Sequence, residues 1–157
     1  MVGMADGLWN WCVADRIDPD RVRGALAGAL ERPVLGLTPA EALLCDVYQV
    51  GGDFPTLVDV YLVPTDIAEE TVASAVAVRL RAAVLLPDDT LNPSRYVLAE
   101  PDGSLRPVHV DEEETDDGAE RRNMRPCTGS DPACAAAAGC DRSRWKPTPT
   151  PERPAAA

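Results

Sequence analysis

The sequence predicts an α+β fold in which two helices pack on one face of a small antiparallel sheet built from two β-hairpins. Two observations predict it. Two pairs of Val- and Leu-rich segments flank glycine-containing turns, and a segment with helical apolar spacing precedes each pair. The order helix, two strands, helix, two strands (αββαββ) favours an antiparallel sheet with one covered face and one open face. The open face is the expected binding surface.

The first helix is expected to run from Pro19 to Leu30. Asp18 is a preferred N-cap residue, and proline is favoured at the first helical position. Apolar residues then recur at every fourth position, and Pro33 ends the pattern.

Two tryptophans precede this helix in a chain that has only seven aromatic residues. Trp9 and Trp11 are two positions apart, so their rings face the same way if the segment is extended. We expect them to form an aromatic lid that closes one end of the sheet.

The first hairpin is expected to pair residues 43–50 with residues 56–63 around a Gly-Gly-Asp-Phe-Pro turn. A second helix should follow Pro64, with Asp66 as its N-cap and an apolar stripe from Ile67 to Ala83. Residues 84–87 form a short apolar run. The second hairpin should pair residues 95–100 with residues 105–110 around a Pro-Asp-Gly-Ser turn.

Composition divides the chain into a folded part and a tail. Residues 1–110 are predicted to form the α+β domain, whereas residues 111–120 contain seven acidic side chains and no large apolar one. Such a segment buries too little surface to offset chain entropy, and it is expected to be a solvated linker. Residues 121–157 are basic and rich in Pro and Ala, which predicts a disordered C-terminal tail.

The acidic balance disfavours nucleic acids and anionic membrane surfaces as partners. The chain holds 26 acidic and 15 basic residues and has a formal net charge of −11. Direct nucleic-acid binding by residues 1–110 is disfavoured because phosphate backbones need clustered Lys and Arg. No apolar run is long enough for a membrane span, and no signal peptide is apparent, so a cytoplasmic protein is expected. A basic protein partner fits this charge.

The pattern Asp-Val-Tyr-x-Val occurs twice, once in each strand of the first hairpin. Strand alternation places Asp46, Tyr48, Asp59 and Tyr61 on one face, and a four-residue loop sets Asp46 opposite Tyr61 and Tyr48 opposite Asp59. Carboxylates and phenols in one patch suit recognition of Arg or Lys on a partner. An ordinary exposed strand face has the same composition, and this alternative stays open.

His109 is the only histidine, and it is the candidate general base in a catalytic alternative. The second hairpin places it opposite Tyr96 and close to Asp111, which could orient it; a small hydrolase or transferase would use His109 with Asp111 or Tyr96. No Ser or Cys nucleophile stands in a glycine-flanked elbow, which favours a histidine at a sheet edge over a small hydrolase or transferase.

The five cysteines divide by position. Cys12 and Cys45 lie in apolar segments and are expected to be buried thiols. Cys127, Cys134 and Cys140 are weak metal candidates: they are seven and six residues apart, lack a close Cys pair and have no histidine near them in the tail. The sequence also lacks a glycine-rich phosphate loop, so no cofactor is expected.

The leading hypothesis is a non-catalytic protein-binding module of the adaptor or immunity (antitoxin-like) type, which presents the acidic Asp and Tyr face to a basic protein partner. The first alternative is the His109 enzyme. A second alternative is an acidic nucleic-acid mimic that blocks a DNA-binding protein. Its affinity for that protein should fall steeply as the salt concentration rises. The oligomeric state does not follow from the sequence.

Overall fold

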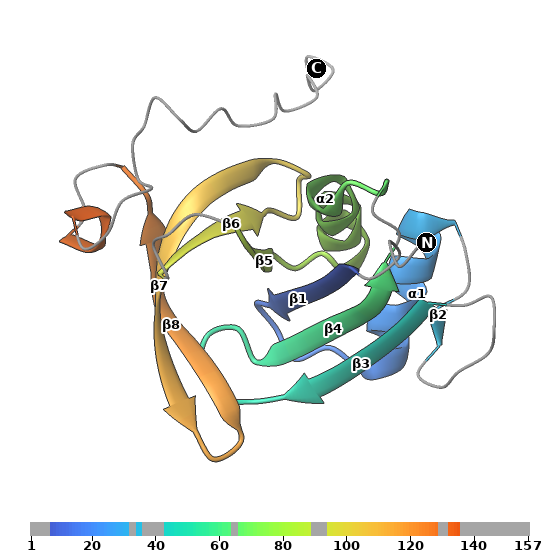
Figure 1. The fold of residues 1–157 in the computed structure, drawn as a ribbon, viewed down its shortest axis with the longest axis horizontal. Coiled ribbons are helices and arrows are strands. Elements are labelled where there is room, and N and C mark those ends of the chain that lie inside the picture. The colour runs from blue at the N-terminus through green and yellow to red at the C-terminus, as the bar shows by residue number, and fades with distance from the viewer. Residues whose placement is uncertain are drawn as a thin grey trace.

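The computed structural model of this chain describes residues 7–31, 34–35, 43–63, 66–88, 94–128 and 132–135. These residues form one large sheet, two α-helices and a short 3-10 helix (Figure 1). The helices are α1 (Pro19–Leu30), α2 (Glu69–Leu80) and η1 (Pro132–Ala135). The strands are β1 (Gly7–Val13), β2 (Val34–Leu35), β3 (Leu43–Gln49), β4 (Thr56–Val63), β5 (Val84–Pro87), β6 (Arg95–Ala99), β7 (Leu105–Thr115) and β8 (Gly118–Pro126).

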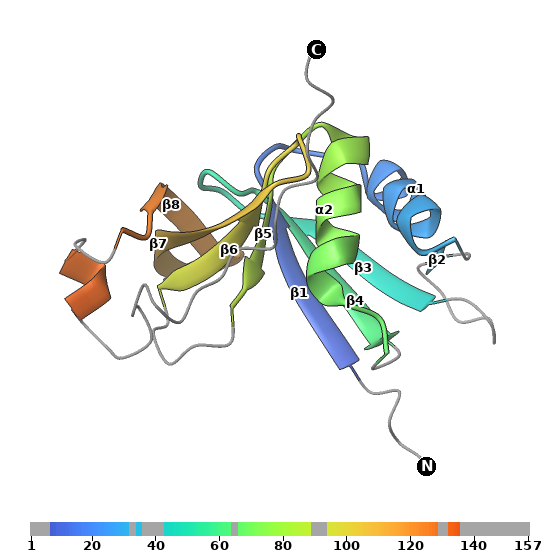
Figure 2. The ribbon, with the colours of Figure 1, turned by 90° about the horizontal axis from the view of Figure 1, so that it is seen from above.

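The strands join in the order β2-β3-β4-β1-β5-β6-β7-β8. Every neighbouring pair is antiparallel except β2 and β3, which are parallel over two residues. The sheet curls into a half-barrel, with both helices on the outside near β1, β3 and β4 (Figures 1 and 2). The predicted small α+β sheet of two hairpins is therefore wrong, because the described residues are mostly β-structure and form one large curled sheet.

Strand β1 is the first element that the predicted fold lacks. It lies in the middle of the sheet, between β4 and β5. Exposed Leu8 and Asn10 alternate there with buried Trp9 and Trp11, which is the pattern of a strand. The two indole rings stack with centroids 5.3 Å apart and join the core beneath the helices. The expected aromatic lid is thus part of a central strand.

The second missing part of the fold is the long hairpin of β7 and β8. Residues 111–120, expected to be a linker, lie in these two strands and their turn. Acidic side chains are tolerated at this end of β7 because they reach water and meet arginines from the neighbouring strand β8. Asp111 forms an ion pair of 3.0 Å with Arg125, and Glu112 forms one of 3.5 Å with Arg121.

Both helices lie where the apolar spacing places them, but only one has the predicted cap. The Asp18 carboxylate accepts a hydrogen bond of 3.0 Å from the backbone N–H of Asp20, which confirms the N-cap of α1. Helix α2 begins later than predicted, with Ala68 at the N-cap and no side-chain cap. The helices cover one face of the sheet through a core that includes Leu26, Val76 and residues of β1, β4 and β6.

A second apolar core lies inside the curl, on the opposite face of the sheet. It is formed by Cys12, Val50, Phe54, Leu57, Leu85, Tyr96, Leu98, Val108 and Val110. Strands β1 and β5 pair at only two positions, so the sheet is not continuously bonded along their shared edge. This incomplete pairing borders the cavity described below.

The loop between β3 and β4 fastens the last strand to this inner core. Gly52 forms a bridge with Arg121 of β8, and the N–H of Asp53 donates to the Arg121 carbonyl at 2.8 Å. Gly52 has φ 87°, and a Cβ at this position would lie 2.9 Å from that carbonyl oxygen. Glycine is required here both by conformation and by space. Strands far apart in the sheet order are therefore held together by one loop.

Among the described residues, the helices are too short or too polar to cross a membrane.

Candidate functional site

The four residues of the repeated pattern form one group on the face of the sheet opposite the helices, which we call the Asp–Tyr patch: Asp46, Tyr48, Asp59 and Tyr61. The predicted face is correct, but the predicted register is wrong by two residues. Asp46 lies opposite Asp59, because six residues rather than four connect the paired ends Gln49 and Thr56. The Tyr61 hydroxyl donates to Asp46 at 3.2 Å, and that of Tyr48 donates to Asp59 at 3.2 Å.

Asp59 is held in place through both of its oxygens. The Asn10 side-chain amide donates to Asp59 Oδ1 at 2.7 Å, and the Tyr48 hydroxyl donates to Oδ2. Burial, followed by the charge of the Asp59 carboxylate, raises the pKa of Tyr48, so its hydroxyl stays protonated as a donor. Asn10 lies directly opposite Asp59 across β1 and β4. Asn10 was not among the predicted site residues, although its alternation with the tryptophans was a visible signal.

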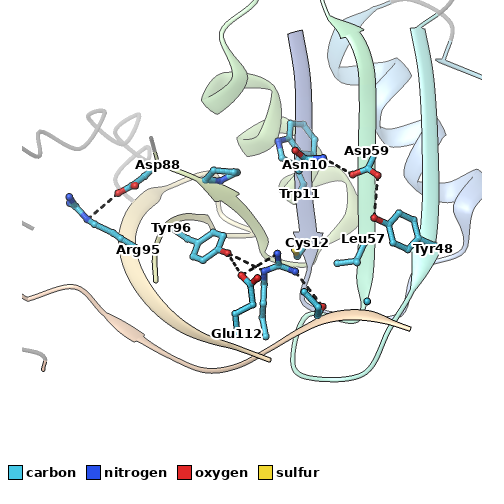
Figure 3. A pocket seen from close by; sticks show the side chains of 14 residues that line it. Asn10, Trp11, Cys12, Tyr48, Leu57, Asp59, Asp88, Arg95, Tyr96 and Glu112 are labelled. Atoms are coloured by element: carbon cyan, nitrogen blue, oxygen red, sulfur yellow. Dashed lines mark hydrogen bonds and ion pairs between the residues drawn. The ribbon is translucent and has the colours of Figure 1, made fainter. Parts of the chain in front are cut away.

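An open cavity of about 610 Å³ lies next to the patch, inside the curl of the sheet (Figure 3). Asn10, Tyr48 and Asp59 form one wall, and Tyr96 and Glu112 lie on the other side (Figure 3). The complete lining is Asn10, Trp11, Cys12, Tyr48, Leu57, Asp59, Pro87, Asp88, Arg95, Tyr96, Glu112, Gly118, Ala119 and Arg121. The predicted patch thus extends into a concave site.

The second wall is a mutually bonded group from three strands. The Tyr96 hydroxyl donates to Glu112 at 2.8 Å and accepts from Arg121 at 3.3 Å. The Arg121 guanidinium lies 5.7 Å from the centre of the Tyr96 ring, within the range of a cation–π interaction. Burial raises the pKa of Tyr96, which keeps its hydroxyl neutral. This wall is preorganised and nearly charge-balanced.

The cavity is lined by three carboxylates and two guanidinium groups. Arg95 forms a buried ion pair with Asp88 at 3.1 Å, and Arg121 pairs with Glu112. Asp59 receives hydrogen bonds from neutral groups, and among the described residues no Lys or Arg forms an ion pair with Asp46 or Asp59. The excess negative charge of the site is therefore concentrated on the Asp–Tyr patch.

The cavity also has an apolar part, which includes Leu57 and Cys12. Burial raises the pKa of the Cys12 thiol to about 11. Cys12 is consequently a neutral thiol at physiological pH and behaves as a small apolar side chain. Cys12 therefore contributes apolar surface to the cavity and does not act as a nucleophile.

The structure separates the three residues of the catalytic alternative. His109 lies opposite Arg95, and Tyr96 lies opposite Val108, so the predicted register is wrong by one residue. A one-residue shift reverses the face, which places Tyr96 in the cavity and keeps His109 out of its lining. A bulge follows His109, and Asp111 instead contacts Arg125 and Asn123. His109 is fully buried.

His109 instead meets two of the cysteines that were weak metal candidates. Its Nε2 lies 3.2 Å from Cys134 Sγ, and Cys134 Sγ lies 3.8 Å from Cys127 Sγ. Cys140, the third candidate, lies outside the described residues. Sequence spacing could not find this group, because the histidine is distant from both cysteines along the chain and belongs to another element.

A scan against protein-family models finds no match to this chain, and searches of the curated proteins and of the solved structures find none either.

Proposed function

We propose that this protein is a binding module of the adaptor or immunity type that holds a basic segment of a partner protein on the Asp–Tyr patch. The observation that carries the proposal is the pair of opposed carboxylates, Asp46 and Asp59, which have no cationic partner among the described residues. Like charges directly opposite each other on neighbouring strands cost stability. A guanidinium or ammonium group placed between them removes that cost and gains charge-assisted hydrogen bonds.

The tyrosines make the patch specific for a cation. Their hydroxyls hold the carboxylates in position, so little side-chain entropy remains to be lost on binding. Tyr48 is 44% exposed, and its ring offers a face for cation–π contact. Aromatic residues with a polar end are enriched among the residues that dominate interface energies.

The cavity beside the patch gives the partner's side chain a place to enter. Leu57 and Cys12 offer an apolar surface for a methylene stem, and Asp59 receives the charged end. Arg121 does not oppose this charge strongly because Glu112 neutralises it from within the opposite wall. An Arg or Lys of the partner therefore fits the cavity better than an acidic or apolar residue.

The test is isothermal titration calorimetry, in which a polyarginine peptide is added to the full-length chain and the dissociation constant is measured. The double variant Asp46→Asn/Asp59→Asn should weaken binding by about tenfold or more, which corresponds to about 1.4 kcal/mol. The matched control is Asp116→Asn/Asp117→Asn, which removes the same charge from two exposed residues in the turn between β7 and β8. The control should change the affinity less than threefold, through the long-range field alone.

The proposal fails if the two double variants weaken binding equally, because the peptide then responds to net charge and not to the patch. It also fails if proteins captured from a lysate by the wild-type chain are captured equally by a variant in which the four patch residues are replaced by Ala and Ser.

A further inference from the structure

A second group of chemistry-bearing side chains lies away from the cavity, where β7, the end of β8 and η1 meet. His109 belongs to β7, Cys127 follows the last residue of β8, and Cys134 belongs to η1. Their ligand atoms, one from each residue, all lie within 4.8 Å of one another. The binding function proposed above uses none of these residues. Three soft or borderline ligands that converge from three elements form a donor set typical of zinc.

The spacing of the two sulfurs fits a shared metal ion. Zinc–thiolate bonds of about 2.3 Å at a tetrahedral angle place two sulfurs roughly 3.8 Å apart. Cys127 Sγ and Cys134 Sγ lie 3.8 Å apart. A disulfide would require a far shorter separation of the sulfurs, so the two thiols are not bonded to each other here. The distance of 3.2 Å from His109 Nε2 to Cys134 Sγ is a few tenths of an ångström below the roughly 3.5 Å that the same tetrahedron requires.

His109 is oriented as a ligand by a residue outside the group. Its Nδ1 lies 2.9 Å from the Ser94 hydroxyl, which can accept a hydrogen bond from Nδ1–H and leave the lone pair of Nε2 directed at the sulfurs. Metal-binding histidines are held by such a partner on the other ring nitrogen, which fixes the tautomer. His109 is fully buried and Cys134 is 9% exposed, so water competes weakly for these ligand atoms.

The backbone places Cys127 beside the strand that carries the histidine. The hairpin register places Val108 opposite Pro126, and the N–H of Cys127 donates to the Pro107 carbonyl at 3.1 Å. Cys127 thus lies beside β7, next to His109. Cys134 reaches the same point from η1, a separate short element.

We propose that His109, Cys127 and Cys134 are three ligands of a zinc site that fastens η1 to the β7–β8 hairpin. The two thiols release their protons to solvent when the ion binds, and neutral His109 binds through Nε2. Three protein ligands leave one position of a tetrahedral ion for water or another ligand. The site is separate from the Asp–Tyr patch, so either proposal can fail without the other.

The test uses the full-length chain, reduced and freed of metal, to which zinc chloride is added before dialysis. Elemental analysis should find one zinc ion per chain. Cobalt(II) in place of zinc should give the strong d–d absorption of a tetrahedral ion and a thiolate charge-transfer band. Weak octahedral absorption would overturn the proposal, as would the absence of zinc after dialysis.

Variants assign the ligands. Cys127→Ser and Cys134→Ser should each reduce the bound zinc to background, and His109→Gln should abolish the cobalt spectrum. The matched control is Cys45→Ala, a buried cysteine in the core beneath the helices, which should retain one zinc per chain. Circular dichroism identifies any variant that has unfolded. Cys127 is only partly buried, so its substitution should disturb packing less than substitution of the buried His109 or Cys134. If those two variants unfold, zinc binding by Cys127→Ser tests the proposal.

Ser94→Ala tests the orientation of His109 without removing a ligand. Loss of this outer partner should weaken zinc affinity about 10- to 100-fold in competition with a chromophoric chelator. Unchanged zinc binding in both Cys127→Ser and Cys134→Ser would overturn the assignment of these residues as zinc ligands.

Discussion

Asp46 and Asp59 lie directly opposite each other on β3 and β4, and each accepts a hydrogen bond from a tyrosine located diagonally across the strand pair. The side chains of opposed residues have Cβ atoms about 5 Å apart, so two negatively charged side chains occupy directly paired positions. The tyrosine hydroxyls reduce the repulsion but add no positive charge. This part of the sheet is therefore less stable than it would be with one carboxylate neutralised.

Replacing one of these carboxylates should stabilise the fold. Asp46→Asn retains an oxygen that can accept from Tyr61, and it should raise the free energy of unfolding by about 0.2–1 kcal/mol at low salt. The gain should shrink in high salt because the repulsion is screened. Urea titrations at two ionic strengths measure both effects. Asp117→Asn is the control, and an equal gain in that variant would attribute the effect to net charge.

The close contact between the β3–β4 loop and β8 makes Gly52 irreplaceable. Gly52→Ala should lower the free energy of unfolding by about 1–3 kcal/mol, because alanine is strained at φ 87° and its Cβ would press on the Arg121 carbonyl. Gly24→Ala is a matched control in α1, where an added Cβ meets nothing within 4 Å. That change should stabilise the protein by about 0.5–1 kcal/mol. Equal effects of the two substitutions in urea would contradict the described contact.

The buried thiols make stability fall in alkaline solution. Burial raises the pKa of Cys12 from 9.0 to about 11 and that of Cys45 to about 12. The unfolded chain therefore loses these protons first. The stabilisation is complete below pH 9 and disappears as the pH rises toward the folded pKa values. The expected loss by pH 10 is about 1.4 kcal/mol for each thiol.

Urea midpoints between pH 8 and pH 10 measure this slope. Tyrosines of the unfolded chain, with an ordinary pKa of 10.0, add to it only near the upper end of the range. The double variant Cys12→Ala/Cys45→Ala should be less stable at neutral pH, because it leaves small cavities, but should have a much flatter profile. A slope as steep as that of the wild type would exclude these two thiols as its cause.

Residues beyond Val110 belong to the folded unit in this structure, which predicts the effect of shortening the chain. A chain ending at Val110 lacks β8 and the end of β7. It therefore lacks Glu112 and Arg121, which contact Tyr96, and the Arg121 carbonyl, which binds the β3–β4 loop. It should lose cooperative unfolding, whereas a chain ending at residue 135 should retain it. Circular dichroism against temperature compares the two. A cooperative transition with the same midpoint in the shorter chain would show that β8 adds nothing to stability.

The parts of the fold that could be predicted are those fixed by local patterns. The cap at Asp18 and the turn residues between β3 and β4 and between β6 and β7 located one helix and two hairpins. The alternation of polar and apolar residues along β3 also identified the face of the strand that carries Asp46. The register could not be predicted, because it depends on the length of each turn, and Val50 and Pro55 extended the first loop.

The parts that could not be predicted depend on contacts between distant residues. The run of acidic residues from 111 to 120 indicated a linker, but the arginines of β8 lie opposite part of it and compensate its charge. The cavity could not be predicted because it forms only when the sheet curls and brings β6 and β8 towards β1. The pattern of a single segment does not specify that curl. The meeting of His109 with Cys127 and Cys134 likewise follows from the hairpin register and the position of η1.

The central position of β1 has a consequence for how the chain folds. Strand β1 is synthesised well before both of its neighbours, since Asn10 pairs with Asp59 of β4 and Cys12 pairs with Leu85 of β5. Nothing local can hold Trp9 and Trp11 until those strands exist, so they remain exposed as the chain leaves the ribosome. Contacts of such long sequence separation slow folding. The segment around β1 therefore needs protection from aggregation during synthesis until β4 and β5 are available to pair with it.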